Sequence, residues 1–204
     1  MENRRGWSDL ATLALLLAVT TACSNTSTGD PRTSPAPTVS SPSVTATPPS
    51  DNDVAATAAT KTVRDYYAVR DQLRQDPTRP LKQLTTVAIS TELSAQENLF
   101  KRERRDGLHQ TGDTKIADLI VQSVSLDNSD PKAGRVPVVQ VDVCYDVSNV
   151  DIVNRAGAST ISKNRPATGW IRYSVANYKW KADPTSSWRV ASGKNIERAP
   201  CAVS

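Results

Sequence analysis

Histidine, methionine and phenylalanine each occur once in the 204 residues, and cysteine occurs three times. The single histidine, His109, excludes a multi-histidine metal centre, and three cysteines are too few for a four-thiolate zinc site. The length allows one modest domain and excludes an enzyme built from several large ones. We therefore predict no metal-binding and no cofactor-binding residue.

A long apolar run is also missing. The longest, Leu10–Val19, has half of the roughly 20 residues that a membrane-spanning helix needs. It follows two arginines and precedes Ala22-Cys23, which is the three-part layout of a secretory signal. A small residue before a cysteine at this place resembles a bacterial lipobox, in which the thiol receives a diacylglyceryl group. Residues 1–22 are thus predicted to be a lipoprotein signal peptide and Cys23 its lipidation site; the alternative is an ordinary signal peptide with a coincidental cysteine.

The next segment, residues 23–52, has few apolar side chains. Seven Ser, six Thr and six Pro occupy most of the positions from Ser24 to Ser50. Such a composition cannot bury enough surface to offset the entropy of ordering the chain. We predict a disordered linker between the lipidated cysteine and a folded domain.

Residues 53–204 show the periodicities of a folded domain. Apolar residues first recur at helical spacing and then, after Gly112, at alternate positions. We expect Asp53 to cap the first helix and Gly107 to end the third. The pattern predicts an α+β fold in which three N-terminal helices pack on one face of a curved four-stranded antiparallel sheet. The expected helices are 53–75, a short one from 80 and 92–106; the expected strands are 115–126, 136–147, 168–181 and 188–192.

Two cysteines remain after Cys23 is assigned to lipid. An oxidising, extracytoplasmic compartment favours a disulfide between Cys144 and Cys201. Such a bond would tie the C-terminal tail to the second strand. The alternative is two free thiols.

Several short motifs, taken in order, resemble one family. The resemblance rests on Asp76-Pro77, Gly112-Asp113, the segment 143–148 (VCYDVS), 155–157 (RAG), 188–190 (WRV) and Pro200-Cys201. These features are similar to extracytoplasmic lipoproteins of actinobacteria and of their phages and mobile elements, with a nuclear transport factor 2-like, or cystatin-like, domain. The resemblance implies a curved sheet wrapped around helices as a cone. It implies no single activity, because that fold carries many functions.

Enzymes of this superfamily use an acidic or histidine base at the mouth of the cone. Asp142, Asp146 and His109 are the candidates here. Both aspartates alternate with the valines of their strand, so we expect them to face solvent or the C-terminal tail, and we expect His109 on the surface. No catalytic residue is predicted.

Basic residues outnumber acidic ones, and four of them cluster near the end of the third helix: Lys101, Arg102, Arg104 and Arg105. One interpretation is a solvated face that complements the helix dipole. The other is a patch for an anionic partner, such as lipid headgroups, wall polymer or an acidic protein. Nucleic acid is not an expected partner, because no recognition motif is present.

Together these features predict a lipoprotein anchored on the outer face of the cytoplasmic membrane. Its domain is expected to be a non-catalytic binding or assembly module of the bacterial envelope, with an envelope protein or a second copy as partner. The alternatives are a small-ligand carrier or isomerase-like enzyme using the cone, and a prophage-encoded surface lipoprotein that blocks superinfection. An apolar cavity with a buried carboxylate would favour the carrier or enzyme.

Overall fold

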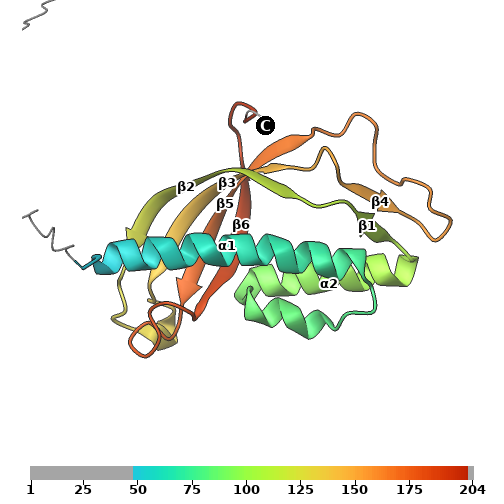
Figure 1. The fold of residues 1–204 in the computed structure, drawn as a ribbon. Coiled ribbons are helices and arrows are strands. Elements are labelled where there is room, and N and C mark those ends of the chain that lie inside the picture. Colours follow the sequence, from blue (N-terminus) through green and yellow to red (C-terminus); the bar gives the residue numbers. More distant parts are fainter. Residues whose placement is uncertain (1–47, 202–204) are drawn as a thin grey trace, which may run out of the picture. The chain divides into compact units, whose positions relative to one another are not determined.

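The computed structural model describes residues 48–201, and Figure 1 shows their fold. The predicted signal peptide, Cys23 and most of the predicted linker lie outside these residues. The elements, in chain order, are α1 (Asp51–Gln75), the 3-10 helix η1 (Leu81–Thr86), α2 (Ser90–Asp106), β1 (His109–Thr111), β2 (Lys115–Ser125), the 3-10 turn η2 (Pro131–Ala133), β3 (Val138–Asp146), β4 (Asp151–Val153), β5 (Thr168–Asn177) and β6 (Trp188–Ile196).

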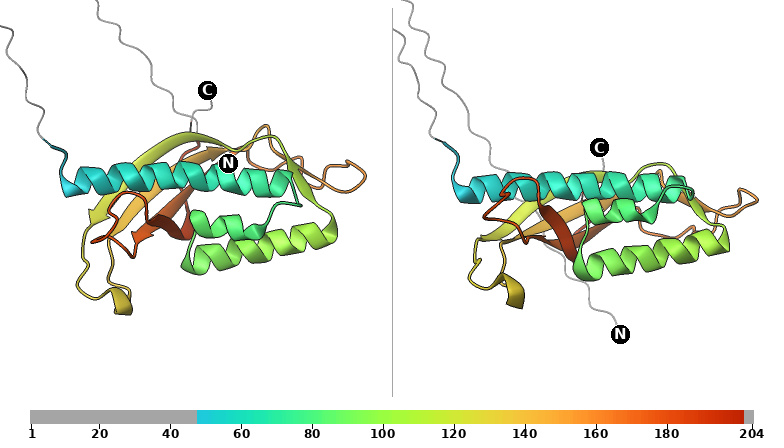
Figure 2. Two further views of the ribbon diagram at one scale, coloured as in Figure 1. Left: turned by 60° about the horizontal axis from the view of Figure 1, so that its bottom comes forward. Right: turned by 90° about the horizontal axis from the view of Figure 1, so that it is seen from below.

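Strands β2, β3, β5 and β6 form an antiparallel meander in that order. Helix α1 runs across one face of this sheet (Figure 1), and η1 packs against both α1 and α2, as the views in Figure 2 show. Helices followed by an antiparallel sheet agree with the α+β prediction. The topology is the one expected when successive strands are joined by turns or by loops without a crossover helix.

The predicted nuclear transport factor 2-like cone is wrong. The four-stranded sheet is a layer with α1 on one face, and it does not wrap around the helices (Figure 1). After β3 the chain leaves this sheet, and β4 pairs with β1 in a separate two-stranded sheet, which we call the ribbon. The sequence analysis missed both ribbon strands because each is only three residues long.

Capping residues set the limits of the two long helices. Ser50 caps α1, and its hydroxyl and the Asp53 carboxylate form a reciprocal capping box. Asp53 is therefore the third residue of the helix and not the predicted cap. At the end of α2, Gly107 adopts a left-handed conformation (φ 73°), as expected for a glycine that terminates a helix.

The main core lies between α1 and the sheet. Val139, Val141 and Val143 of β3 are fully buried on the face toward α1, where Ala59 and Val63 are also fully buried. This arrangement follows from the alternation in β3, which places its odd-numbered side chains on one face. A second cluster, formed by Leu73, Leu84 and Phe100, packs the two long helices against η1.

Strand β5 ends earlier than predicted, and β6 continues further. The fully buried Asn177 ends β5, because its amide donates to the carbonyl of Asp183 (2.8 Å) and its oxygen accepts from the backbone of Lys179 (2.8 Å). These bonds form a turn, so Tyr178 and Trp180 lie outside the strand that was predicted to hold them.

Candidate ligand cavity between the first helix, the sheet and the ribbon

A cavity of about 360 Å³ lies where the second half of α1 meets the ends of β3 and β5. Tyr67, Arg70 and Arg74 line it from α1, and Tyr145 and Ile171 line it from the sheet. The remaining wall comes from the ribbon, from the loop between β4 and β5, and from the connections that precede β2 and β4. Because three elements distant in sequence meet here, the fold itself defines the site.

Arg70 is the unusual residue of this cavity. Its side chain is half-buried, and its Nε is enclosed without a hydrogen-bond partner in the described part of the chain. No carboxylate among residues 48–201 lies within ion-pair distance of it. The guanidinium instead contacts the faces of Tyr66 and Tyr67, with its carbon 5.1 and 5.5 Å from the ring centres. Arginine stays charged in proteins, so this is a partly desolvated cation that forms no ion pair within residues 48–201. Burial acts to lower the pKa of Arg70, but Glu92 acts on it electrostatically from beyond ion-pair distance and helps to raise that pKa.

A network of buried phenols surrounds Arg70. The rings of Tyr66, Tyr67 and Tyr173 meet edge to face, with centres 5.6 to 6.1 Å apart. The hydroxyls of Tyr67 and Tyr173 lie 3.2 Å apart, within hydrogen-bond distance. Burial raises the pKa of all three phenols, which are therefore neutral at physiological pH.

Asp71, which accepts from Gln110 and from Thr114 of the cavity wall, is one buried carboxylate of this region. Glu92 is another, and it does not pair with Arg70. Its Oε1 accepts from the hydroxyl of Tyr66 and from the amide of Gln96 (2.9 Å). Neutral donors thus satisfy that oxygen, and no residue that lines the cavity is acidic. A buried carboxylate in the cavity would have favoured a carrier or an enzyme. Asp71 and Glu92 are buried beside this cavity, whereas its wall contains the half-buried cation Arg70.

The two other arginines of the cavity differ in how they are held. Arg74 forms a bidentate ion pair with Glu103 (3.0 and 2.6 Å), so its charge is compensated. Arg165 donates to the carbonyls of Val147 and Val150 (both 2.8 Å), which carry no net charge. The cavity wall therefore holds two cations, Arg70 and Arg165, that form no ion pair with a carboxylate among the described residues.

Two glycines make room for tyrosines on the cavity side of the sheet. Gly169 lies opposite Tyr145, and Gly193 lies opposite Tyr173. A Cβ on Gly169 would come within 2.3 Å of the Tyr145 hydroxyl, and one on Gly193 within 2.8 Å of the Tyr173 ring. Each ring lies across the glycine of the next strand, an arrangement that fixes its orientation.

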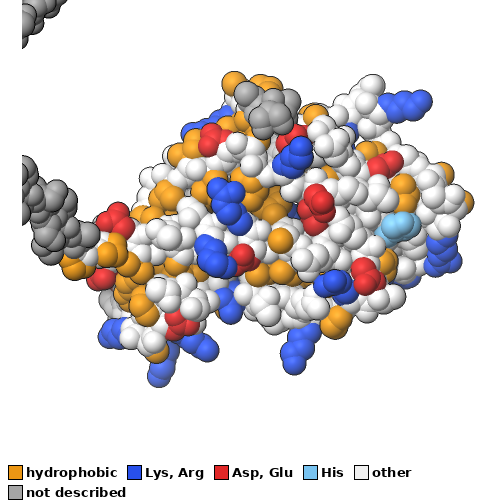
Figure 3. Space-filling view, viewed as in Figure 1, with side chains coloured by type: hydrophobic (Ala, Val, Ile, Leu, Met, Phe, Trp, Pro, Cys, Tyr) orange, Lys and Arg blue, Asp and Glu red, His pale blue; other side chains and the backbone are white. Residues whose placement is uncertain are grey.

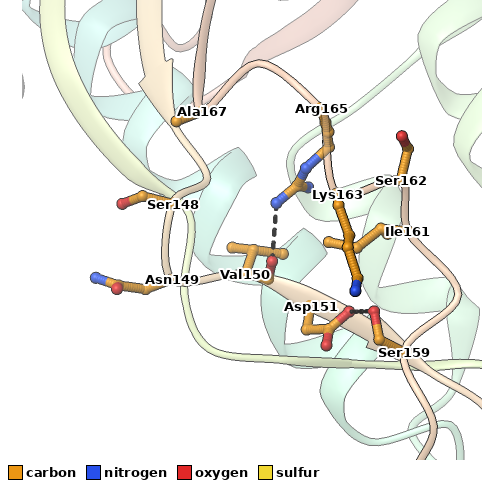
Figure 4. A pocket seen from close by; sticks show the side chains of 10 residues that line it. All are labelled: Ser148, Asn149, Val150, Asp151, Ser159, Ile161, Ser162, Lys163, Arg165 and Ala167. Carbon is orange, nitrogen blue, oxygen red and sulfur yellow. Dashed lines mark hydrogen bonds between the residues drawn. The ribbon is translucent and has the colours of Figure 1, made fainter.

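A second, more open pocket of about 470 Å³ adjoins the first (Figure 4). Val150, Ile161 and Arg165 line both, so these side chains form the partition between them. In this outer pocket Ser159 donates to Asp151 (2.8 Å), and no histidine lines it. A serine bonded to a carboxylate without an intervening base does not form a nucleophile triad.

Asp142 and Asp146 lie on the opposite face of the sheet from this cavity. Asp142 is fully buried between Arg172 (2.6 and 2.9 Å) and Arg198 of the C-terminal tail (3.3 Å). A hydrogen bond from the Ser148 backbone lowers the pKa of Asp146, which is therefore ionised at neutral pH. Both residues stabilise the fold. His109 lies in the ribbon, where it pairs with Val153. Both aspartates belong to β3 of the four-stranded sheet, so neither is a strand partner of His109.

The two domain cysteines lie at disulfide distance, as the predicted pairing requires. Cys144 and Cys201 form the bond, with their Cα atoms 6.3 Å apart. The tail is also held by the indole of Trp170, which donates to the carbonyl of Ala199 (2.9 Å). Arg198 lies over the same indole, 4.8 Å from the ring centre. The tail therefore packs against β3 and β5 on part of the sheet face that α1 leaves free.

The four basic residues of the predicted patch have separate contacts. Lys101 pairs with Glu97 (3.3 Å), and Arg105 lies 3.5 Å from Asp106. Arg104 turns toward α1 and donates to the carbonyl of Leu73 (3.2 Å), while Arg102 is exposed. On the face seen in Figure 3, basic side chains are spread among acidic and apolar ones.

Among the described residues no group of three or more His, Cys, Asp or Glu is placed to hold a metal ion. None of the helices in residues 48–201 combines the length and hydropathy needed to cross a bilayer.

Sequence reasoning missed Arg70, although a signal was present. Arg70 follows Val63, Tyr66 and Tyr67 by seven, four and three positions, which places it on the apolar face of the helix. A charged residue on a buried helix face requires a partner, and the sequence does not show whether one exists.

No family model matches the chain, and no curated protein matches it. Among solved structures, one similar chain is the intermembrane-space region of the chloroplast protein ARC6 (17% identity, TM-score 0.48), over 70% of this chain and 97% of that one. Another is a de novo β-sheet design protein (14% identity, TM-score 0.28), over 69% and 92%. Likenesses this weak establish neither a shared fold nor a shared ligand.

Proposed function

We propose that this chain is an exported lipoprotein, anchored on the outer face of the bacterial cytoplasmic membrane by lipid on Cys23, whose domain binds a ligand without catalysis. The observation that carries the binding role is the cavity around Arg70, which offers an unpaired cation and an apolar wall. Charge and apolar surface in one concave site favour recognition of a small molecule. The resemblance to actinobacterial and phage-encoded lipoproteins belongs to the same proposal.

The location is supported by the chemistry of the cysteines. A disulfide between Cys144 and Cys201 persists in an oxidising compartment and is rare in the bacterial cytosol. A pair of acyl chains on Cys23 would give stable membrane attachment, which one chain alone would not. Association with an envelope protein or with a second copy remains a prediction, which crosslinking in intact cells would test.

Replacing Cys23 by alanine tests the anchor. We expect the Cys23→Ala protein to lose metabolic labelling with an alkyne fatty acid and to leave the membrane fraction, because its acyl attachment site is gone. The matched control is Ser24→Ala, which changes the neighbouring residue and keeps the thiol. A Cys23→Ala protein that is still labelled, or still pelleted with membranes, would contradict the proposed anchor.

A further inference from the structure

We infer that the Arg70 cavity binds a small anionic amphiphile, with one acid headgroup against Arg70 and an aliphatic body against the branched side chains of the wall. This inference rests on the proposed function and deepens it, since it names the ligand class of the binding module. The headgroup chemistry is that of a carboxylate or a phosphate monoester, both of which match the planar donor fork of arginine.

The first step is the electrostatic state of Arg70. Buried cations in proteins are paired, because removing a charge from water is costly unless a partner compensates it. Arg74, one helical turn further along α1, follows this rule through Glu103. Arg70 does not, and the nearby Glu92 accepts from Tyr66 and Gln96 instead. A ligand anion would supply the missing partner.

The second step is the shape and lining of the cavity. Its volume of about 360 Å³ lies within the range of small-molecule sites. Beyond the arginines, its wall contains branched aliphatic side chains: Val147, Val150, Ile152, Ile161 and Ile171. These side chains favour an aliphatic body, because burying apolar surface against them is the driving force available. No acid lines the wall itself; the buried carboxylate of Asp71 lies behind Thr114 and accepts hydrogen bonds from Thr114 and Gln110.

The third step is access. The outer pocket of about 470 Å³ shares Val150, Ile161 and Arg165 with the cavity. Arg165 donates to the carbonyls of Val147 and Val150, and its guanidinium is directed at Val150 on the shared wall (Figure 4), where it forms no ion pair within the described chain. The second uncompensated cation therefore lies on the partition that the headgroup would approach.

The test is a calorimetric titration of the full chain carrying Cys23→Ser, with four probes. Decanoate and octyl phosphate are the two anionic amphiphiles; decanol lacks the charge, and acetate lacks the chain. We expect at least one anionic amphiphile to bind about tenfold or more tightly than decanol and acetate, because a charged hydrogen bond and apolar burial then act together. The preferred amphiphile identifies the headgroup. Equal binding of decanol, equal binding of acetate, or no binding of either amphiphile would overturn the inference.

Two variants assign the binding to Arg70. Arg70→Met keeps the length of the side chain and removes the charge, and we expect it to lose the preference for the anion over decanol, a loss of about tenfold or more in affinity. Arg64→Met is the matched control: it removes one positive charge from an exposed position of the same helix, outside the cavity. The control should retain the affinity of the parent chain. Retained affinity in Arg70→Met, or equal loss in both variants, would refute the site.

Thermal unfolding curves of the same proteins distinguish a loss of binding from a loss of folding. The midpoint of Arg70→Met should be unchanged or higher than that of the parent chain, since an unpaired cation is removed. A lower midpoint would assign Arg70 a structural role and overturn the inference. Titration and membrane fractionation are separate measurements, so failure of the ligand class and failure of the anchor can be told apart.

Discussion

Removing the disulfide measures how far the C-terminal tail stabilises the domain. Cys144 and Cys201 are 57 positions apart. In the chain-entropy model, closing a loop of this length removes about 14 cal/mol/K from the unfolded chain. At 25 °C this amounts to about 4 kcal/mol. The Cys201→Ala variant should therefore have a folding equilibrium constant lower by about three powers of ten.

Cys201 is the better position for this change, because Cys144 is fully buried and its packing should be kept. The tail's remaining contacts, from Arg198 to Asp142 and from Trp170 to Ala199, stay available in the variant. For a domain of about 150 residues, the entropy of unfolding is about 0.3 kcal/mol/K, so the expected fall in melting temperature is about 13 °C.

The assay is thermal unfolding followed by circular dichroism, with the parent chain under reducing conditions as the matched comparison. Reduction should reproduce the effect of Cys201→Ala, since both open the same loop. A variant that melts within about 3 °C of the oxidised parent would refute the reasoning, because the loop-closure entropy would then not be expressed in stability.

Two further predictions concern a glycine and a carboxylate. Gly112→Ala should lower the free energy of unfolding by about 3 kcal/mol or more, because the φ of Gly112 is 72° and a Cβ would lie 1.9 Å from the Asn149 carbonyl oxygen. Gly134→Ala is the matched control. Gly134 has a φ of 82° and no atom within 4 Å of the added Cβ, so this change should cost only about 1 kcal/mol. Chemical denaturation would measure both, and equal losses would contradict the clash. Hydrogen bonds from the backbone of Ser186 and the side chain of Ser187 lower the pKa of Asp183. The ionised Asp183 therefore stabilises the folded state at a pH above the ordinary aspartate pKa, and this contribution is lost as the pH falls through the lowered pKa of the folded state. The difference in stability between the parent and Asp183→Asn should then disappear in acid; a difference that persists at low pH would contradict this assignment.

Much of the local structure could be predicted because it depends on near neighbours. Helical spacing placed α1 and α2 to within two residues, and alternation predicted a strand over 136–147 where β3 spans Val138–Asp146. Gly107 ends α2 as expected for a left-handed cap. The opposite orientation of Asp142 and the valines followed from the same alternation.

The errors concern contacts between distant parts of the chain. The pairing of β1 with β4 places His109 opposite Val153, and no local sequence pattern predicts this pairing. The ribbon is thus a separate two-stranded sheet, and the four-stranded sheet does not wrap around the helices as the expected cone requires. The end of β5 at Asn177 likewise depends on a side-chain bond across a turn.

The candidate site could not be predicted for a similar reason. The sequence places Arg70 on the apolar face of α1, but it does not show whether a carboxylate forms an ion pair with Arg70. Only the structure shows that Tyr66 and Gln96 donate to Glu92, and that Glu103 pairs with Arg74 and not with Arg70.

Helix α1 acts as a spacer within the domain. The described chain enters this helix at Asp51, and Arg70 lies 19 residues further on, roughly 29 Å along the axis at 1.5 Å per residue. The N-terminal end of α1, where the described chain enters the helix, is thus far from the proposed ligand site beside Arg70 near its C-terminal end.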